Sequence, residues 1–261
     1  MNITIINDCN DPNDSARQVI RVKSLFKTQP TFIAVKNELE ASGNIIDAID
    51  ANENKKGVII VNVAPRGGKG KKFKNGTPFG YFWYKKILIV SSIDGLTLSL
   101  VNKLKMTKFI NILDTEESLN ILADKKYIKQ EQISYIKNSQ FRSFDFEPRV
   151  AYYLWKNKSI KSKKISIGEI SDVPKAIWWV DNFGNCKTTV FAKEYNLKFG
   201  NFLKTNFGKL KYYKRLKDVP DKKPAIITGS SGLGKNRFLE VVIQGKNAAK
   251  YFNLSSGNLI N

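Results

Sequence analysis

The 261-residue chain contains no histidine and only two cysteines. Without histidine, neither a Ser-His-Asp nor a Cys-His catalytic group can form, and most catalytic zinc sites lose their usual ligand. Any proton transfer must use Asp, Glu, Lys, Tyr or water, and we expect no metal centre. Cys9 and Cys186 lie far apart in the sequence, which favours two thiols in a reducing compartment over a disulfide.

Long hydrophobic runs are also missing. No apolar stretch approaches the ~18 residues that a membrane-spanning helix needs. The first eight residues lack the basic start and the cleavage site of a signal peptide and are typical of a β-strand. The sequence therefore predicts a cytoplasmic protein with no membrane partner. Hydrophobic residues make up 42% of the chain, which is enough to form buried cores.

Negative charge is scarce: Lys and Arg number 44 against 23 Asp and Glu, which gives a net charge of +21. Clustered basic residues bind nucleic acid through counterion release. Here the lysines are spread along the chain, a pattern that also fits a compositional bias with ordinary solvated lysines. Charge alone indicates association behaviour rather than a site, so nucleic-acid binding is the less favoured alternative.

The first half of the chain alternates apolar strands with helical patterns. Residues 57–63 are nearly continuous Val and Ile, which is typical of a parallel strand covered on both faces. This rhythm predicts an α/β fold, with a three-layer domain and a mostly parallel sheet over residues 1–156. Strands are expected at 3–7, 31–35, 57–63, 79–84 and 87–90, and helices at 17–26 (capped by Asp14 and Ser15), near 45–52, and at 95–105.

The composition changes after Trp155. Residues 157–164 are rich in Lys and Ser, which favours an interdomain linker over 157–172. Short strands without long helices then predict a small β-barrel domain over 173–261. These strands are expected at 176–180, 186–191, 224–228 and 238–243.

One glycine-rich segment matches a nucleotide-binding motif. Residues 229–235, Gly-Ser-Ser-Gly-Leu-Gly-Lys, fit the G-x-x-x-x-G-K core of a P-loop. Asn236, however, stands where the magnesium-binding Ser or Thr belongs, and a strand-like run follows instead of a helix N-terminus. We interpret the segment as a glycine-rich hairpin loop.

Two acidic positions lie where ligands are often bound. Residues 181–185 (Asp-Asn-Phe-Gly-Asn) favour a tight turn, and Asp181 and Asn185 could equally present a carboxylate and an amide to a ligand. Asp8 ends the first predicted strand, at the position where open α/β sheets place ligand contacts. It either caps a helix or remains solvated, or it accepts the two hydroxyls of a ribose.

Together these segments occur in the order and spacing of the S-adenosylmethionine (SAM) hydroxide adenosyltransferase/fluorinase family. The chain resembles this family over nearly its whole length, most specifically in its second half. The resembling segments are 5–8 with Asp14 and Ser15 (opening strand, Asp and helix), 61–68 (D-P-G-V-G), 90–97 (A-P-D-N-G-L-L-T), 141–154 (F-H-G-R-D and the next helix), 180–185 (V-D-x-F-G-N), and 238–242 with 247–249 and Gly257 (G-[FY]-L-E-I-A…A-A…G).

The resemblance implies an N-terminal α/β domain, a C-terminal β-barrel, and a homotrimer with SAM at the interface of neighbouring subunits. The implied reaction is an SN2 displacement at ribose C5′, in which water or a halide expels methionine, with SAM as substrate and no separate cofactor. Asp8 matches the contact to the ribose hydroxyls, Asp181 a contact to the methionine end, and Asn185 a contact to adenine. Ser230 matches a methionine-carboxylate contact and Gly245 a backbone contact near adenine.

The residues that handle the nucleophile depart from the family pattern. Water-using members resemble one another in an Asp, an Arg and a His, and the Asp and His positions here are Ala64 and Arg142. Arg66 lies where it could replace the lost Arg. Ser143 falls where fluoride-using members carry Ser, but their fluoride-enclosing Tyr and Thr correspond to Ala64 and Gly67. The candidate catalytic residues are therefore Arg142, Ser143 and Arg66.

Three functions fit this pattern. The favoured one is transfer of the adenosyl group to water, which yields adenosine and methionine. The second is transfer to a halide or another anion attracted by Arg142 and Ser143. The third is a non-catalytic SAM-binding or interaction protein that uses its basic surface.

Overall fold

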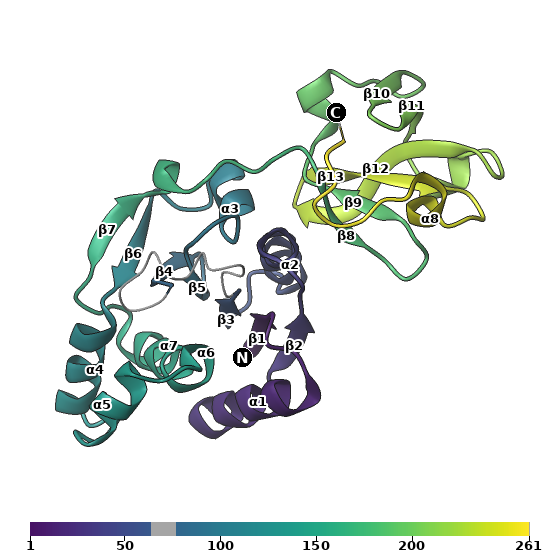
Figure 1. The fold of residues 1–261 in the computed structure, drawn as a ribbon. Coiled ribbons are helices and arrows are strands. Elements are labelled where there is room, and N and C mark those ends of the chain that lie inside the picture. The colour runs from purple at the N-terminus through teal and green to yellow at the C-terminus, as the bar shows by residue number, and fades with distance from the viewer. Residues whose placement is uncertain (64–76, 261) are drawn as a thin grey trace. The chain divides into compact units, whose positions relative to one another are not determined.

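The computed structural model describes residues 1–63 and 77–260 (Figure 1). The chain divides into two compact units, Met1–Asp172 and Val173–Asn261. The fold is mixed α/β, with a seven-stranded sheet in the first unit and a six-stranded sheet in the second. No helix in the described ranges is long and apolar enough to cross a bilayer.

The sheet of the first unit has the strand order β2-β1-β3-β5-β4-β6-β7. Its strands are β1 (Asn2–Asn7), β2 (Thr31–Ala34), β3 (Gly57–Asn62), β4 (Phe79–Tyr84), β5 (Ile87–Ser92), β6 (Phe109–Leu113) and β7 (Lys163–Ser166). The ladders that join β2, β1, β3 and β5 are parallel, whereas those between β5 and β4, β4 and β6, and β6 and β7 are antiparallel. The prediction of a mostly parallel sheet is therefore correct for only one half of it, because a two-residue turn at Lys85 and Lys86 forces β4 and β5 to pair antiparallel.

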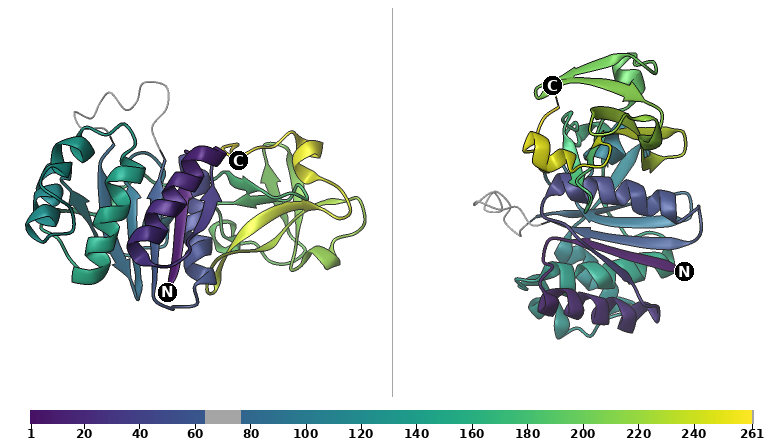
Figure 2. Two further views of the ribbon diagram at one scale, coloured as in Figure 1. Left: turned by 90° about the horizontal axis from the view of Figure 1, so that it is seen from below. Right: turned by 90° about the vertical axis from the view of Figure 1, so that its right-hand side faces the viewer.

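Helices cover both faces of this sheet, as Figure 1 and the right-hand view of Figure 2 show. One face carries α2 (Glu38–Ala51) and α3 (Ser99–Lys103). The other carries α1 (Pro12–Phe26), α4 (Thr115–Asp124), α5 (Gln132–Lys137), α6 (Arg142–Asp145) and α7 (Glu147–Asn157). The hydrophobic core on this second face contains alternate strand residues, such as Ile3 and Ile5 of β1, together with Val150 and Leu154 of α7.

Two helix starts differ from the sequence prediction. The side chain of Asp11, and not that of Asp14 or Ser15, caps α1 by accepting hydrogen bonds from the backbone N–H groups of Asn13 and Asp14 (2.9 and 3.1 Å). Pro12 then occupies the first turn, where a missing N–H costs nothing. Asn37 caps α2 at Glu40 N, so that this helix begins well before the apolar residues that signalled it.

The predicted linker at 157–172 is partly a strand. Residues Lys163–Ser166 form β7, which pairs antiparallel with β6 and belongs to the first unit. Lys163 and Lys164 are exposed, because β7 is the edge strand of the sheet. Charged residues on an edge strand prevent edge-to-edge association, and the same composition is typical of a linker.

The second unit has the strand order β10-β11-β12-β13-β9-β8. Its elements are β8 (Ile177–Val180), β9 (Cys186–Thr188), β10 (Phe202–Thr205), β11 (Gly208–Tyr213), β12 (Pro224–Leu233), β13 (Asn236–Ile243) and α8 (Ala248–Phe252). Strands β10 and β11 were not among the strands predicted from the sequence. Strands β8 and β10 are the edges of this sheet, and no hydrogen-bonded ladder joins them among residues 173–260. The strands therefore form an open sheet rather than the closed barrel that was predicted.

Candidate functional site

Asp8 directly follows β1, and its backbone N–H donates to the carbonyl of Asn62 at the end of β3 (3.3 Å). Asn7 stabilises the loop that follows β1. Its side-chain amide donates to Gln18 Oε1 (2.6 Å), and its Oδ1 accepts from Cys9 N (2.8 Å). Gln18 in turn donates to the carbonyl of Cys9 (3.0 Å). The Asp8 carboxylate is partly exposed and accepts a weak hydrogen bond from the Cys9 thiol (3.8 Å). The structure therefore places Asp8 at the carboxyl edge of the parallel strands.

Arg142 lies at the same edge of the sheet, near the start of β4. Its Nη2 donates to the carbonyl of Thr77 (2.6 Å), and its guanidinium carbon lies 5.2 Å from the ring centre of Phe79. Burial lowers the pKa of Arg142, and the nearby charge of Glu147 opposes this effect. A pocket of about 360 Å³ adjoins Arg142, with Asp114, Thr115 and Lys163 among its lining residues. Ser143, the next residue, is buried.

Glu147 is a buried acid that sequence reasoning missed. It is fully buried, its Oε1 accepts from Val61 N (3.2 Å), and its Oε2 has no hydrogen-bond partner within the described chain. Burial raises the pKa of Glu147 well above its ordinary value, and the Val61 N–H and the charge of Arg142 oppose this only partly. Acidic residues are common in the first turn of a helix, because the helix dipole favours negative charge there. The sequence around Glu147 therefore gives no sign that its side chain is buried.

Helix α6 is a single turn that carries Arg142 and Ser143, and the side chain of Asp145 fixes this turn. Its Oδ2 accepts from the Ser139 hydroxyl (2.6 Å), and its Oδ1 lies 3.5 Å from Arg21 Nη1 and 3.8 Å from Arg149 Nη1. Burial and the neighbouring Arg21 lower the pKa of Arg149 to about 10. Arg21 comes from α1, so the position of this turn depends on a contact between distant parts of the first unit.

The Asp181 turn in the second unit is held by its own side chains. Asp181 Oδ1 accepts from the backbone N–H groups of Phe183 and Asn185 (both 2.9 Å), and Oδ2 accepts from Asn185 Nδ2 (3.0 Å). Gly184 has φ +87°, and its carbonyl accepts from Ala249 N (2.9 Å). A Cβ at Gly184 would lie 2.0 Å from Asn247 Cγ, so the turn packs closely against the start of α8.

A pocket of about 570 Å³ opens beside this turn. Asn185 and Gly245, the two residues assigned to adenine, both line it, together with Phe183 and Asn247. Phe183 is 71% exposed, so its ring is available to a ligand. Ser230 does not line this pocket: it is exposed on β12, and its carbonyl accepts from Arg237 Nη1 (2.9 Å).

The glycine-rich segment at 229–235 forms the hairpin that the sequence predicted. Gly232 pairs with Arg237 and Leu233 with Asn236, so Lys235 lies in the turn between β12 and β13. Arg237 also donates to the carbonyl of Gly232 (3.0 Å). Because strands lie on both sides, no helix N-terminus faces this loop, and the P-loop interpretation is wrong.

Three residues of the nucleophile set, Ala64, Arg66 and Gly67, lie outside the described residues. Neither cysteine is in a disulfide, and burial raises the pKa of the Cys186 thiol to about 12. Within residues 1–63 and 77–260, no group of three or more acidic or thiol side chains is arranged to hold a metal ion.

No family model matches the sequence, and no curated protein matches it. Among solved structures, the chain is similar to an uncharacterized conserved protein from Thermotoga maritima, with 16% identity and a TM-score of 0.69 over 98% of this chain and 97% of that one. It is also similar to a conserved hypothetical protein from Thermus thermophilus, with 15% identity and a TM-score of 0.61 over 98% of this chain and 97% of that one. At this level of identity, the likeness shows a shared fold.

Proposed function

We propose that the protein binds SAM and transfers its adenosyl group to water, releasing adenosine and L-methionine. The observation that carries this proposal is the pocket beside the Asp181 turn. Asn185 and Gly245 lie about 60 residues apart in sequence, were each assigned to adenine, and line one pocket of about 570 Å³. The Asn185 amide offers a donor and an acceptor to a purine edge, and the exposed ring of Phe183 offers a stacking surface.

In this proposal the other SAM groups are held by acidic and hydroxyl side chains. Asp8 accepts the two ribose hydroxyls, and Ser230 contacts the methionine carboxylate. Asp181 contacts the methionine ammonium. An ionised carboxylate has about four acceptor positions, and three N–H groups of the turn already use three of them at Asp181. One position on Oδ2 remains for a ligand N–H, so Asp181 both builds the turn and contacts the substrate.

The reaction is a single displacement. The oxygen of a water molecule attacks C5′, the C5′–sulfur bond breaks, its electron pair stays on sulfur as a neutral thioether, and the attacking water loses a proton to solvent. A sulfonium is already a good leaving group, so the protein mainly orients and desolvates the nucleophile. Arg142 is a donor only, and together with Ser143 it orients the nucleophile without accepting its proton.

Arg142 also supports the second candidate, in which a halide or another anion attacks C5′. A half-buried guanidinium attracts an anion more strongly than a neutral side chain does. The third candidate is a SAM-binding protein without turnover. The same proposal includes the architecture that the resemblance implies: a three-layer N-terminal domain, a barrel-like C-terminal domain, and a homotrimer with SAM between neighbouring subunits. It also includes Arg66 as a catalytic residue and a cytoplasmic location.

Turnover of SAM separates these candidates. We would incubate the purified protein with SAM in acetate, chloride and fluoride buffers and chromatograph the products. Adenosine and methionine in every buffer support hydrolysis. A 5′-halo-adenosine that forms only with the added halide supports the candidate in which an anion attacks C5′. Calorimetric binding without products selects the non-catalytic protein.

Variants at the pocket test the site itself. Asn185→Ala should weaken SAM binding about tenfold or more, because a purine edge loses its amide partner. Asn182→Ala is the matched control, since Asn182 is exposed in the same turn and should leave the affinity unchanged. Equal SAM affinity in the wild type and both variants would remove the pocket from the proposal.

A further inference from the structure

A basic surface lies at the amino edge of the seven-stranded sheet, at the opposite ends of β3 and β5 from Asp8 and Arg142. Lys55 and Lys56 precede β3, and Lys85 and Lys86 form the turn between β4 and β5. The Gly57 N–H donates to the carbonyl of Lys86 (3.3 Å), which brings the two lysine pairs side by side. These four residues are called the amino-edge lysine patch.

The amino-edge lysine patch carries positive charge that nearby acids do not neutralise. Its four lysines are exposed, and no carboxylate forms an ion pair with any of them in the described ranges. Residues 52–58 and 83–88 hold four lysines and one acid, Glu53. Lys85 Nζ donates to Asn54 Oδ1 (2.8 Å), an uncharged partner that leaves its charge available to an anion.

The strand that leads into the Lys85–Lys86 turn carries an aromatic stack. Trp83, two residues before Lys85, stacks on Trp155 of α7 with ring centres 6.0 Å apart. Lys158 Nζ lies 4.5 and 4.6 Å from the two ring centres, and its carbonyl accepts from Trp83 Nε1 (3.1 Å). Half-buried tryptophans beside lysines form the combination of stacking surface and phosphate-binding charge that single-stranded nucleic acids require.

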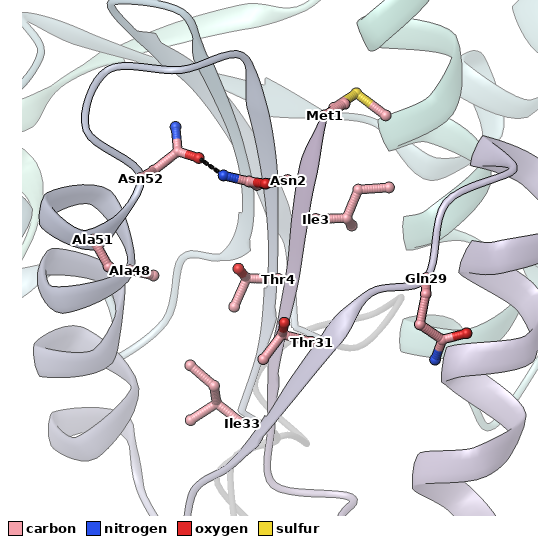
Figure 3. Close-up of a pocket in the computed structure, with 10 residues that line it drawn as sticks. All are labelled: Met1, Asn2, Ile3, Thr4, Gln29, Thr31, Ile33, Ala48, Ala51 and Asn52. Carbon is pink, nitrogen blue, oxygen red and sulfur yellow. Dashed lines mark hydrogen bonds between the residues drawn. The ribbon is translucent and has the colours of Figure 1, made fainter.

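A pocket of about 290 Å³, lined by both polar and apolar residues, includes Asn2 and Asn52, which contact the backbone of the lysine turn (Figure 3). Asn2 and Asn52, hydrogen bonded to each other at 2.6 Å, line it together with the hydroxyls of Thr4 and Thr31. Asn52 Nδ2 donates to the carbonyl of Lys55 (2.5 Å), and Asn2 N donates to that of Lys56 (3.2 Å), so the pocket wall and the lysine turn are one structure. Amides and hydroxyls supply both donors and acceptors, which match the edges of an unpaired base.

We propose that the amino-edge lysine patch, with the Trp83–Trp155 stack and the pocket at Asn2 and Asn52, binds single-stranded nucleic acid. Lysine ammonium groups contact successive phosphates, and unpaired bases contact the tryptophan rings and the pocket. A double helix keeps its bases stacked inside and offers neither contact, so charge alone would hold it. This site is separate from the proposed SAM site and does not depend on it.

Fluorescence anisotropy with labelled dT20 and rU20 tests the proposal. The variant Lys55→Gln/Lys56→Gln/Lys85→Gln/Lys86→Gln should weaken binding about tenfold or more at 50 mM salt and reduce the slope of log K against log [salt] by about 0.7 for each lost phosphate contact. The matched control, Lys204→Gln/Lys209→Gln/Lys222→Gln/Lys223→Gln, removes the same charge from exposed positions of the second unit and should bind like the wild type.

Three results would overturn the proposal. Equal weakening in both quadruple variants would show diffuse charge attraction, and equal affinity for a DNA duplex of the same length would show that the bases are not contacted. No binding of either oligonucleotide at 50 mM salt would also overturn it. If the wild type then binds phosphatidylserine vesicles and the patch variant does not, the surface is assigned to an anionic membrane instead. SAM binding serves as the folding control, and a thermal unfolding midpoint replaces it if the protein does not bind SAM.

Discussion

The Asp181 turn in the second unit and the Asp145-fixed turn in the first both carry candidate ligand-binding residues, but they are held differently. Asp181 accepts three hydrogen bonds, all from residues within four positions of it in sequence. Asp145 is ion-paired to Arg149, four positions away, and to Arg21, 124 positions away. The carboxylate contacts that hold the Asp181 turn are therefore local, although Gly184 also packs against α8. The Arg142–Ser143 position, in contrast, exists only once α1 and α7 have packed.

The largest effect is expected at Asp145. Asp145→Ala leaves Arg21 and Arg149 partly buried without their acid, and breaking such a pair costs about 3–5 kcal/mol in free energy of unfolding. Urea unfolding measures the loss. Asp14→Ala, which breaks an exposed pair with Arg17, should cost less than about 1 kcal/mol. Equal losses in the two variants would show that the Asp145 contacts do not fix the turn.

The next effect concerns Gly184, where the Asp181 turn meets α8. Gly184→Ala places a Cβ 2.0 Å from Asn247 Cγ on a backbone with φ +87°, and should cost about 3 kcal/mol. Gly200→Ala is the matched control, because Gly200 has φ +88° and no atom within 4 Å of the added Cβ. It should cost only the backbone term of about 1 kcal/mol. Similar unfolding midpoints for the two variants would argue against close packing at Gly184.

Asp8 and Asp181 should separate ligand binding from turn stability. Asp8→Ala should weaken SAM binding about tenfold, or about 1.4 kcal/mol, with the unfolding midpoint nearly unchanged. Asp181→Ala should lower both the affinity and the midpoint, because its carboxylate also holds the turn. Calorimetry and thermal unfolding measure the two quantities, and Asp124→Ala, on the exposed end of α4, is the control. Unchanged affinity in both variants would contradict the SAM site.

The smallest effect is a pH dependence at Glu147. Its pKa in the folded chain is raised by burial, so the folded state holds a proton that the unfolded chain releases above its ordinary pKa near 4.5. Stability from this group is therefore fully present below about pH 4.5 and declines as the pH rises toward the folded pKa. Between pH 5 and pH 8 the wild type should lose stability relative to Glu147→Gln, because only the wild type carries the buried acid. Parallel curves would contradict the assignment, and the exposed Glu131→Gln should not alter the slope.

Parts of the fold could be predicted from local patterns. The nearly continuous Val and Ile run at 57–63 predicted strand β3 (Gly57–Asn62), which is buried at all six positions. Strands β10 and β11 were missed because Gly208 and the lysines at 204, 209 and 211 interrupt their apolar residues, a composition that is typical of loops. The same reason made β7 look like a linker, since an edge strand leaves one side to solvent.

The candidate site divides in the same way. Turn-forming residues predicted the turn at Asp181, and the rule for strand ends placed Asp8 correctly. Glu147 and Asp145 carried no signal, because acids near a helix start are common and their burial depends on distant partners such as Val61 and Arg21. The pocket shared by Asn185 and Gly245 required β9, β13 and α8 to be brought together.

The sequence by itself determined the strands with continuous apolar runs, the Asp181 turn and the absence of histidine chemistry, because these depend on composition and on contacts between near neighbours. Only the tertiary structure decided which acids are buried, which lysines gather at the amino edge, and which residues share a pocket. Those properties arise from contacts between positions up to 124 residues apart, and neither periodicity nor local turn chemistry encodes such contacts.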